Sequence, residues 1–283
     1  MAAAPQGDRG HLAWVGVRQG KERVYACGVR VASGSDGAPE SIEVDEPAVV
    51  SAAGVVSAPA IAAAGDEVLL AHGEARAGRS RIVLRRLGSA SIGAPVVLSG
   101  PGTDAWAPSL ALAAIGGRGA VCAWQETAGK TSRILLRRVD GPKTAAPVFS
   151  SEGPSDHAPV VAWMRDGRLA LAWEQHGPGQ STIRAVLVDP TGAKVERIAV
   201  ADKVGLNMAP ALLVGSDGTL FVAYHTNAIG DGAPGIPKWI EVRAIRAGLV
   251  HESAGPQLGV DPDRRGIDQG FEFPTLVEHP NRA

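Results

Sequence analysis

Short apolar runs alternate with turn residues along the whole chain, and none of the runs has the 3.6-residue period of an amphipathic helix. Five runs directly follow a proline, and each is predicted to be a strand that opens at that proline: 59–63, 108–113, 159–163, 210–214 and 274–277. In three copies the next residues include a Gly-Asp or Asp-Gly pair, which is typical of tight hairpins. The pattern therefore predicts an all-β chain.

The same order of strands recurs about every fifty residues. A second strand follows each turn, at 12–16, 68–72, 120–124, 169–173 and 220–224. A third strand follows a loop, at 23–29, 81–87, 133–139, 182–188 and 240–245, and a weaker fourth strand closes the unit. Because such a sheet cannot bury its faces alone, copies must stack around an axis. The repeat predicts a β-propeller of five four-stranded blades.

The two ends of the chain are out of phase with the repeat, since it begins at a second strand and ends after a first strand. We therefore predict that 274–277 pairs beside 12–16 and completes the N-terminal blade, which removes exposed sheet edges. This gives one domain, 1–283, with blades at 11–50 plus 271–279, 57–105, 106–156, 157–207 and 208–270. The alternative is a fragment of a six- or seven-bladed propeller.

Composition narrows the choice of partners. The net charge is −1 and the basic residues are scattered in short pairs, which argues against nucleic acid. No run of eighteen apolar residues predicts a membrane span, and the first residues lack a signal-peptide core, so the compartment stays open. Cys27 and Cys122 lie in apolar runs and are expected to be buried free thiols.

One motif carries a family resemblance: Ala-Pro-x-x-Ala, then Asp-Gly, then Ala-Trp-Glu or Ala-Trp-Gln, then Ile-x-x-Arg. The copy that begins at Ala158 has the first three parts, and the copy that begins at Ala107 has Ala-Trp-Gln and Ile-x-x-Arg. It resembles bacterial sialidase-like propeller repeats of uncharacterised function. The resemblance implies a propeller fold and makes an extracytoplasmic location one option. The Asp-box Ser-x-Asp-x-Gly-x-x-Trp and the Phe-Arg-Ile-Pro motif of sialidases are both absent, so it does not imply sialidase catalysis.

The repeat also predicts where a ligand would bind. In a propeller, the loops before each first strand meet the loops between second and third strands at the mouth of the central channel. Two positions before each strand-opening proline the residue differs in every copy: Ser57, Trp106, His157, Met208 and Glu272. Variation at one repeated position is expected of a surface that recognises a ligand. Unconstrained drift of loop residues is the alternative.

Two sets of site residues follow from this ring. Asp104, Asp156 and Glu272 are the candidate catalytic carboxylates of a glycoside hydrolase, with solvated surface acids as the alternative. Trp106 could stack on a ring-shaped ligand. The full set of candidate ligand-binding residues is Trp106, His157, Asn207, His225, Asn227 and Glu272.

Asp261, Asp263 and Asp268 have the short spacing of calcium ligands, but Arg264 and Arg265 between them oppose a cation. We therefore expect no cofactor, with calcium as the alternative. The leading hypothesis is a non-catalytic propeller that binds a small molecule, a glycan or a protein partner at its loop-rich rim. The alternatives are a glycan-active hydrolase, the N-terminal module of a longer enzyme, and a purely structural repeat module.

Overall fold

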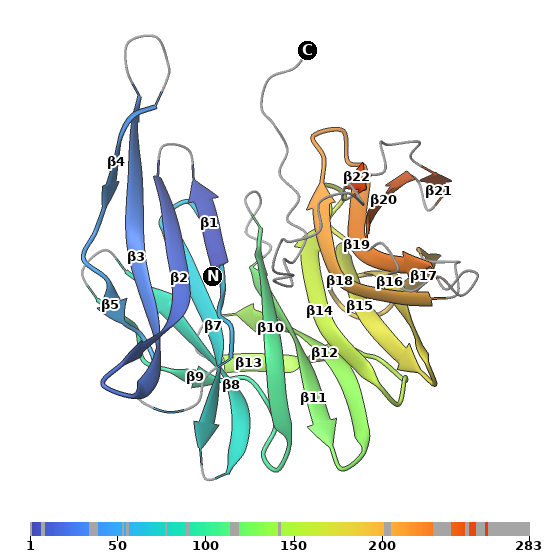
Figure 1. Ribbon diagram of the computed structural model, residues 1–283, viewed down its shortest axis with the longest axis horizontal. Coiled ribbons are helices and arrows are strands. Elements are labelled where there is room, and N and C mark those ends of the chain that lie inside the picture. The colour runs from blue at the N-terminus through green and yellow to red at the C-terminus, as the bar shows by residue number, and fades with distance from the viewer. Residues whose placement is uncertain are drawn as a thin grey trace. The chain divides into compact units, whose positions relative to one another are not determined.

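The computed structural model describes residues 2–6, 9–33, 39–52, 54, 57–76, 78–88, 91–113, 119–140, 143–200, 205–228, 239–246, 249–252 and 258–259. These residues form strands β1 to β22 and no helix, and so none that could cross a membrane (Figure 1). The chain divides into two compact units, 1–150 and 151–283, and each is described by itself.

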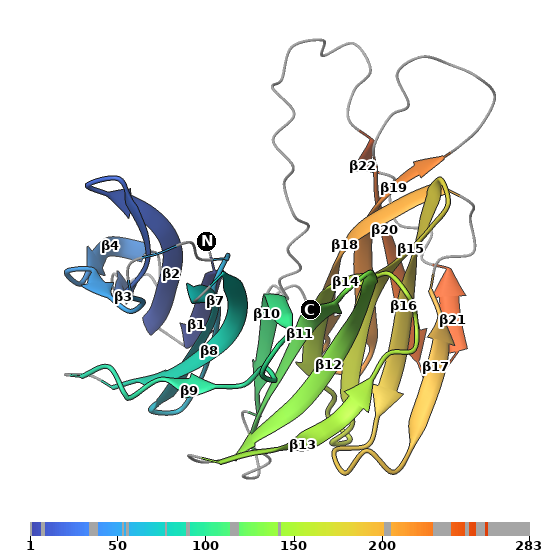
Figure 2. The ribbon, with the colours of Figure 1, turned by 90° about the horizontal axis from the view of Figure 1, so that it is seen from below.

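Unit 1 contains three antiparallel sheets whose strands follow one another in chain order (Figure 2). In the first sheet a short fifth strand, β5, pairs with β3. The strands of the first sheet are β1 (Ala2–Gln6), β2 (Arg9–Arg18), β3 (Lys21–Ser33), β4 (Pro39–Val44) and β5 (Ala48–Val49). Those of the second are β6 (Ala60–Ala64), β7 (Glu67–Arg76), β8 (Arg79–Leu87) and β9 (Val96–Val97), and those of the third are β10 (Asp104–Leu112), β11 (Ala120–Ala128), β12 (Thr131–Asp140) and β13 (Lys143–Ser150).

Unit 2 contains two groups of strands that repeat the same order. A single parallel bridge between Ser181 and Leu206 joins the groups into one nine-stranded sheet. The first group is β14 (Asp156–Trp163), β15 (Leu169–Gly177), β16 (Gln180–Val188) and β17 (Val195–Ala199). The second is β18 (Gly205–Val214), β19 (Leu220–Ala228), β20 (Trp239–Arg246), β21 (Leu249–Glu252) and β22 (Leu258–Gly259).

The first strand of the N-terminal sheet differs from the prediction. We expected 274–277 beside 12–16, but β1 occupies that place, in register from Ala2 opposite Ala13 to Gln6 opposite Arg9. The predicted C-terminal strand lies outside the described residues. A run of alanines has no alternation of apolar and polar residues, whereas backbone hydrogen bonds pair strands whatever their side chains. The sequence pattern therefore missed β1.

The Ala-Pro pairs also differ from the prediction in three of the first strands. Only β6 begins next to its proline, Pro59. In β10, β14 and β18 the strand begins earlier, and the Ala-Pro pair forms a β-bulge at 107–108, 158–159 and 209–210. A bulge leaves a residue out of the hydrogen-bond ladder, so it tolerates proline as well as a strand end does.

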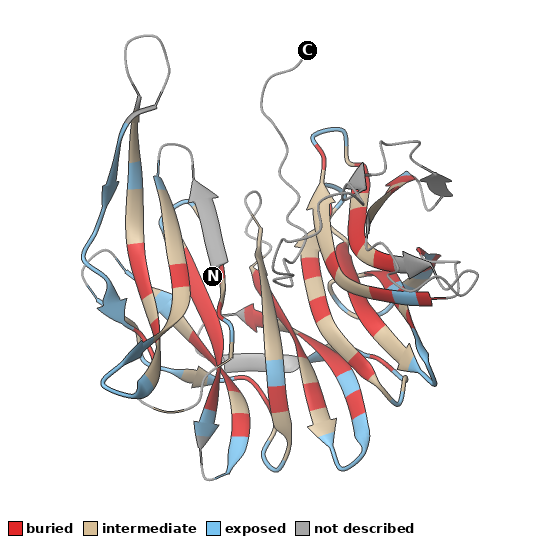
Figure 3. Cartoon of the chain, viewed as in Figure 1, coloured by how far each residue is buried: buried red, intermediate tan, exposed pale blue. Residues whose placement is uncertain are grey.

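Each unit has its own apolar core (Figure 3). The residues at one repeated position of the second strands are buried: His72 in β7, Trp124 in β11, Trp173 in β15 and Tyr224 in β19. Trp124 is fully buried and lies under the guanidinium of Arg137, 5.5 Å from its ring centroid. Trp124 and Tyr224 belong to the apolar clusters of their units, so this column contributes to the packing of the core. Cys27 and Cys122 are buried free thiols, as predicted.

Candidate functional site

The three β-bulges share a strained residue. Ala107, Ala158 and Ala209 have φ of 47°, 47° and 54°, in the left-handed region that side chains disfavour. Such a conformation costs about 1–3 kcal/mol and persists where the surrounding structure enforces it. This conformation could not be predicted from the sequence, because alanine rarely adopts positive φ.

Each bulge directly follows one of the variable residues of the predicted ring. Trp106, His157 and Met208 precede the three strained alanines, and each pairs across to the second strand of its own sheet. The cross-strand pairs are Trp106–Gln125, His157–Glu174 and Met208–His225. Side chains of directly opposed residues lie on the same face of a sheet. Each of these three strands therefore presents, with its neighbour, a different pair of side chains beside an equivalent bulge.

In unit 2 the His157–Glu174 pair belongs to a larger polar cluster. His157 Nε2 lies 2.9 Å from the hydroxyl oxygen of Ser155, and the His157 ring meets that of His176 edge to face, with centroids 4.7 Å apart. His176 Nε2 lies 2.7 Å from the Glu174 carboxylate. Burial, and then the charge of His176, lower the pKa of His157, although Glu174 and Asp156 act in the opposite direction. His157 is therefore neutral at pH 7 and can both donate and accept hydrogen bonds.

Glu174 also holds the neighbouring bulge in place. Its second carboxylate oxygen accepts the backbone N–H of the strained Ala209, at 2.7 Å. Because Glu174 lies in β15 and Ala209 in β18, the carboxylate links the two strand groups of unit 2. The carboxylate that faces His157 is thus fixed by contacts to both His176 and the backbone.

The predicted catalytic carboxylates are held by the protein itself. Asp156 is fully buried and accepts the backbone N–H of Gly153 at 3.1 Å and the side-chain amide of Gln175 at 3.2 Å. Asp104 is partly buried and accepts the backbone N–H of Ser80 at 2.8 Å. Both aspartates therefore have a structural role, whatever further role they have.

Two glutamates of the second strands are also held by contacts within the protein. Glu74 and Glu126 are buried and pair with Arg81 and Arg133, at 2.8 and 2.9 Å. Burial raises the pKa of Glu74, but the hydrogen bond and charge of Arg81 outweigh it and the pKa is lowered. These ion pairs recur at one repeated position of β7 and β11, which indicates that they stabilise the repeated sheet.

The remaining predicted site residues fall into three groups. Asn207 is buried, and its side-chain amide donates to the Ser181 carbonyl at 2.9 Å, so it links β16 and β18. His225 is half-buried in β19, and Asn227 lies in the same strand, opposite Leu206. Glu272 and the three aspartates Asp261, Asp263 and Asp268 lie outside the described residues. Within the described part of the chain, no group of His, Cys, Asp or Glu side chains could hold a metal ion.

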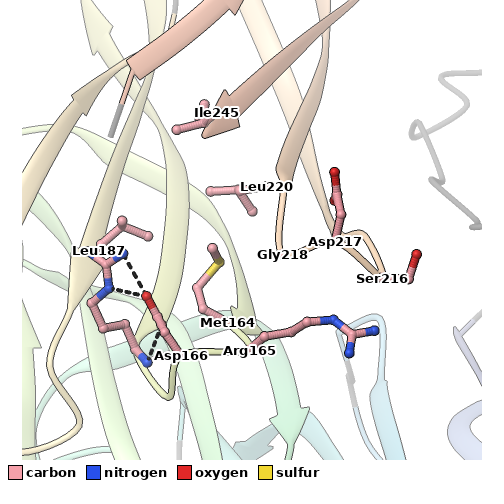
Figure 4. A pocket seen from close by; sticks show the side chains of 10 residues that line it. Met164, Arg165, Asp166, Leu187, Ser216, Asp217, Gly218, Leu220 and Ile245 are labelled. Atoms are coloured by element: carbon pink, nitrogen blue, oxygen red, sulfur yellow. Dashed lines mark hydrogen bonds and ion pairs between the residues drawn. The ribbon is translucent and has the colours of Figure 1, made fainter. Parts of the chain in front are cut away.

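A cavity of about 350 Å³ lies at the opposite end of β14 from His157, between the β14–β15 and β18–β19 turns (Figure 4). Its charged rim is internally paired: Arg168 contacts Asp166 at 2.7 Å, and Asp217 pairs with Arg246. The bulge end, where side chains vary between copies, is therefore the better candidate site. The residues that line the cavity are Met164, Arg165, Asp166, Arg168, Leu187, Ser216, Asp217, Gly218, Leu220 and Ile245.

Comparison with solved structures identifies the fold. A thermostable family-43 glycoside hydrolase matches with a TM-score of 0.55 and 12% identity, over 94% of this chain and 95% of that one. A xylan β-1,4-xylosidase from Bacillus halodurans C-125 matches with a TM-score of 0.53 and 12% identity, over 95% of this chain and 58% of that one. The chain is a five-bladed β-propeller.

Other comparisons add less about this propeller. The Hadza microbial sialidase Hz136 matches with a TM-score of 0.51 and 11% identity, over 83% of the propeller and 54% of the sialidase. No protein-family model matches the sequence, and a search of curated proteins finds no relative. At these identities the structural matches establish the fold, which the sequence predicted, and leave the chemistry to be argued from the side chains.

Proposed function

We propose that this propeller binds glycans, and that the side chains beside the Ala-Pro bulges contact them. The observation that carries the proposal is the strained alanine that follows a variable residue in three strands, β10, β14 and β18. Backbone strain that is kept in several copies, next to positions that differ between copies, is expected where a fold presents interchangeable recognition groups. The glycosidases and the sialidase that share this fold support a sugar as the ligand.

The cluster in unit 2 has the chemistry that a sugar hydroxyl requires. The neutral imidazole of His157, the Ser155 hydroxyl and the Glu174 carboxylate together offer donors and acceptors within one small region. Contacts to His176 and to the Ala209 N–H fix the orientation of Glu174. A fixed orientation reduces the entropy lost on binding, which favours affinity for a small polar ligand.

The test is a glycan-array screen of the intact chain followed by calorimetry on any sugar that binds. His157→Ala should weaken binding at least about tenfold, since it removes a central polar contact. Glu196→Ala, on the exposed β17, is the matched control and should leave affinity unchanged. Failure of the wild-type chain to bind any glycan would reject the proposal.

The second candidate function is glycoside hydrolysis, which is favoured by the match of a glycoside hydrolase over 94% of the chain. Hydrolysis needs one ionised and one protonated carboxyl group. Asp104 and Asp156 already accept backbone N–H groups of the protein. This hypothesis then assigns the role of proton donor to Glu272. The wild-type chain should then release reducing sugar from xylan or arabinan, and Glu272→Gln should abolish this release. Binding of a glycan without hydrolysis would contradict this hypothesis and favour a non-catalytic propeller.

A further inference from the structure

The indole of Trp106 stands out among the described hydrophobic side chains. It is 37% exposed, whereas the other large hydrophobic side chains of similar or greater exposure are all aliphatic. Trp106 lies in β10, directly before the strained Ala107, and the bulge fixes its backbone. An exposed aromatic ring on a rigid strand is suited to stack on the apolar face of a sugar ring.

The groups around Trp106 are defined by the strand register. Gln125 is directly opposite it, Thr127 is opposite Asp104, and Ser132 is opposite Thr127 on the next strand. These residues share one face of the sheet, because alternate residues of a strand point to the same side. The face thus combines one indole, one amide, two hydroxyls and one carboxylate, and these five positions include no Lys, Arg or His.

The arginines near this face do not supply an excess of positive charge. Arg133 belongs to the opposite face, where it pairs with Glu126 at 2.9 Å. In the neighbouring sheet, Arg81 pairs with Glu74, and Arg79 donates to the Gly102 carbonyl close to Asp104. Recognition of a sugar carboxylate uses arginines that can form bidentate contacts. The charge balance around Trp106 therefore favours an uncharged sugar.

We propose that Trp106 is the stacking platform for a neutral sugar, with Gln125 as its hydrogen-bonding neighbour, and that the ligands of this propeller are neutral rather than acidic glycans. The inference rests on the proposed glycan binding. It goes beyond that proposal because it names the class of sugar and the residue that selects it. A preference for neutral sugars would separate this chain from sialidases, whose fold it shares.

The experiment titrates the intact chain with two neutral probes, xylohexaose and arabinohexaose, and two acidic probes, 3′-sialyllactose and tetragalacturonate. Tryptophan fluorescence and calorimetry report binding. At least one neutral probe should bind, and Trp106→Ala should weaken its binding at least about tenfold. Trp106→Phe should retain affinity to within a few-fold, because it keeps an aromatic face. Gln125→Ala should weaken it by a smaller factor.

Val97→Ala is the control, since Val97 is 43% exposed on β9 of the same unit but in a different sheet from the register positions that define the face. Thermal melts of every variant check that the fold is intact. Tighter binding of an acidic probe, or unchanged affinity of a folded Trp106→Ala variant, would overturn this inference and leave glycan binding standing. Binding of no glycan at all would instead reject the proposed function, and this inference with it.

Discussion

Replacement of Asp156 separates a structural role for this carboxylate from a catalytic one. Asp156→Ala removes the acceptor for the Gly153 N–H and the Gln175 amide inside a fully buried site. A hydrogen bond to a charged group contributes about 1.5–3 kcal/mol, so two would contribute about 3–6 kcal/mol. Because the Gln175 amide also lies beside the exposed Arg184 and can turn toward water, we expect a net loss of about 2–4 kcal/mol.

Differential scanning calorimetry measures this loss. For a domain of this size, each kcal/mol lowers the melting temperature by about 2–4 °C, so Asp156→Ala should melt roughly 5–15 °C lower than the wild type. Glu152→Ala is the matched control: its carboxylate is 88% exposed and 3.5 Å from Arg197, so it should melt within about 2 °C of the wild type. An Asp156→Ala variant that keeps the wild-type melting temperature would refute the structural argument.

Three further predictions concern the same framework. Burial lowers the pKa of His72 below its usual 6.5, and its Nε2 is buried without a hydrogen-bond partner. The free energy of unfolding should therefore fall as the pH drops below about 6.5, by up to about 1.4 kcal/mol per pH unit. In urea melts at several pH values, the unfolding free energy of His72→Phe should depend less on pH than that of the wild type. Gly153→Ala should lower the melting temperature, because its Cβ would collide with the Asp156 carboxylate, whereas Gly100→Ala, with nothing within 4 Å of the added Cβ, should cost less. Ser181→Ala should cost about 1–3 kcal/mol in chemical denaturation, because its hydroxyl bonds both the N–H and the C=O of Asn207.

The repeat could be predicted from the sequence because its strongest features are local. Each second strand contains a short run of apolar residues, which in four of the five copies ends on a buried ring such as Trp124. Each is followed by a third strand in antiparallel register. Such runs reflect burial on both faces of a sheet, which the amino acids report directly. The five-bladed propeller follows from counting these runs.

The details of the site could not be predicted in the same way. A proline after an alanine is compatible with a strand start or with a bulge, and only the register of β10 against β11 distinguishes them. No local pattern indicates that Glu74 and Glu126 are buried, because their burial depends on arginine partners seven residues later. The role of Glu174 could not be predicted either, because its contact with Ala209 spans 35 residues.

The most direct test of the account is glycan affinity in the triple variant Trp106→Ala, His157→Ala, Met208→Ala. These substitutions remove the variable side chain before each strained alanine and leave the bulges themselves in place. The account predicts a folded protein, with a cooperative thermal melt, that no longer binds the glycan bound by the wild type. Wild-type affinity in the folded triple variant would contradict it.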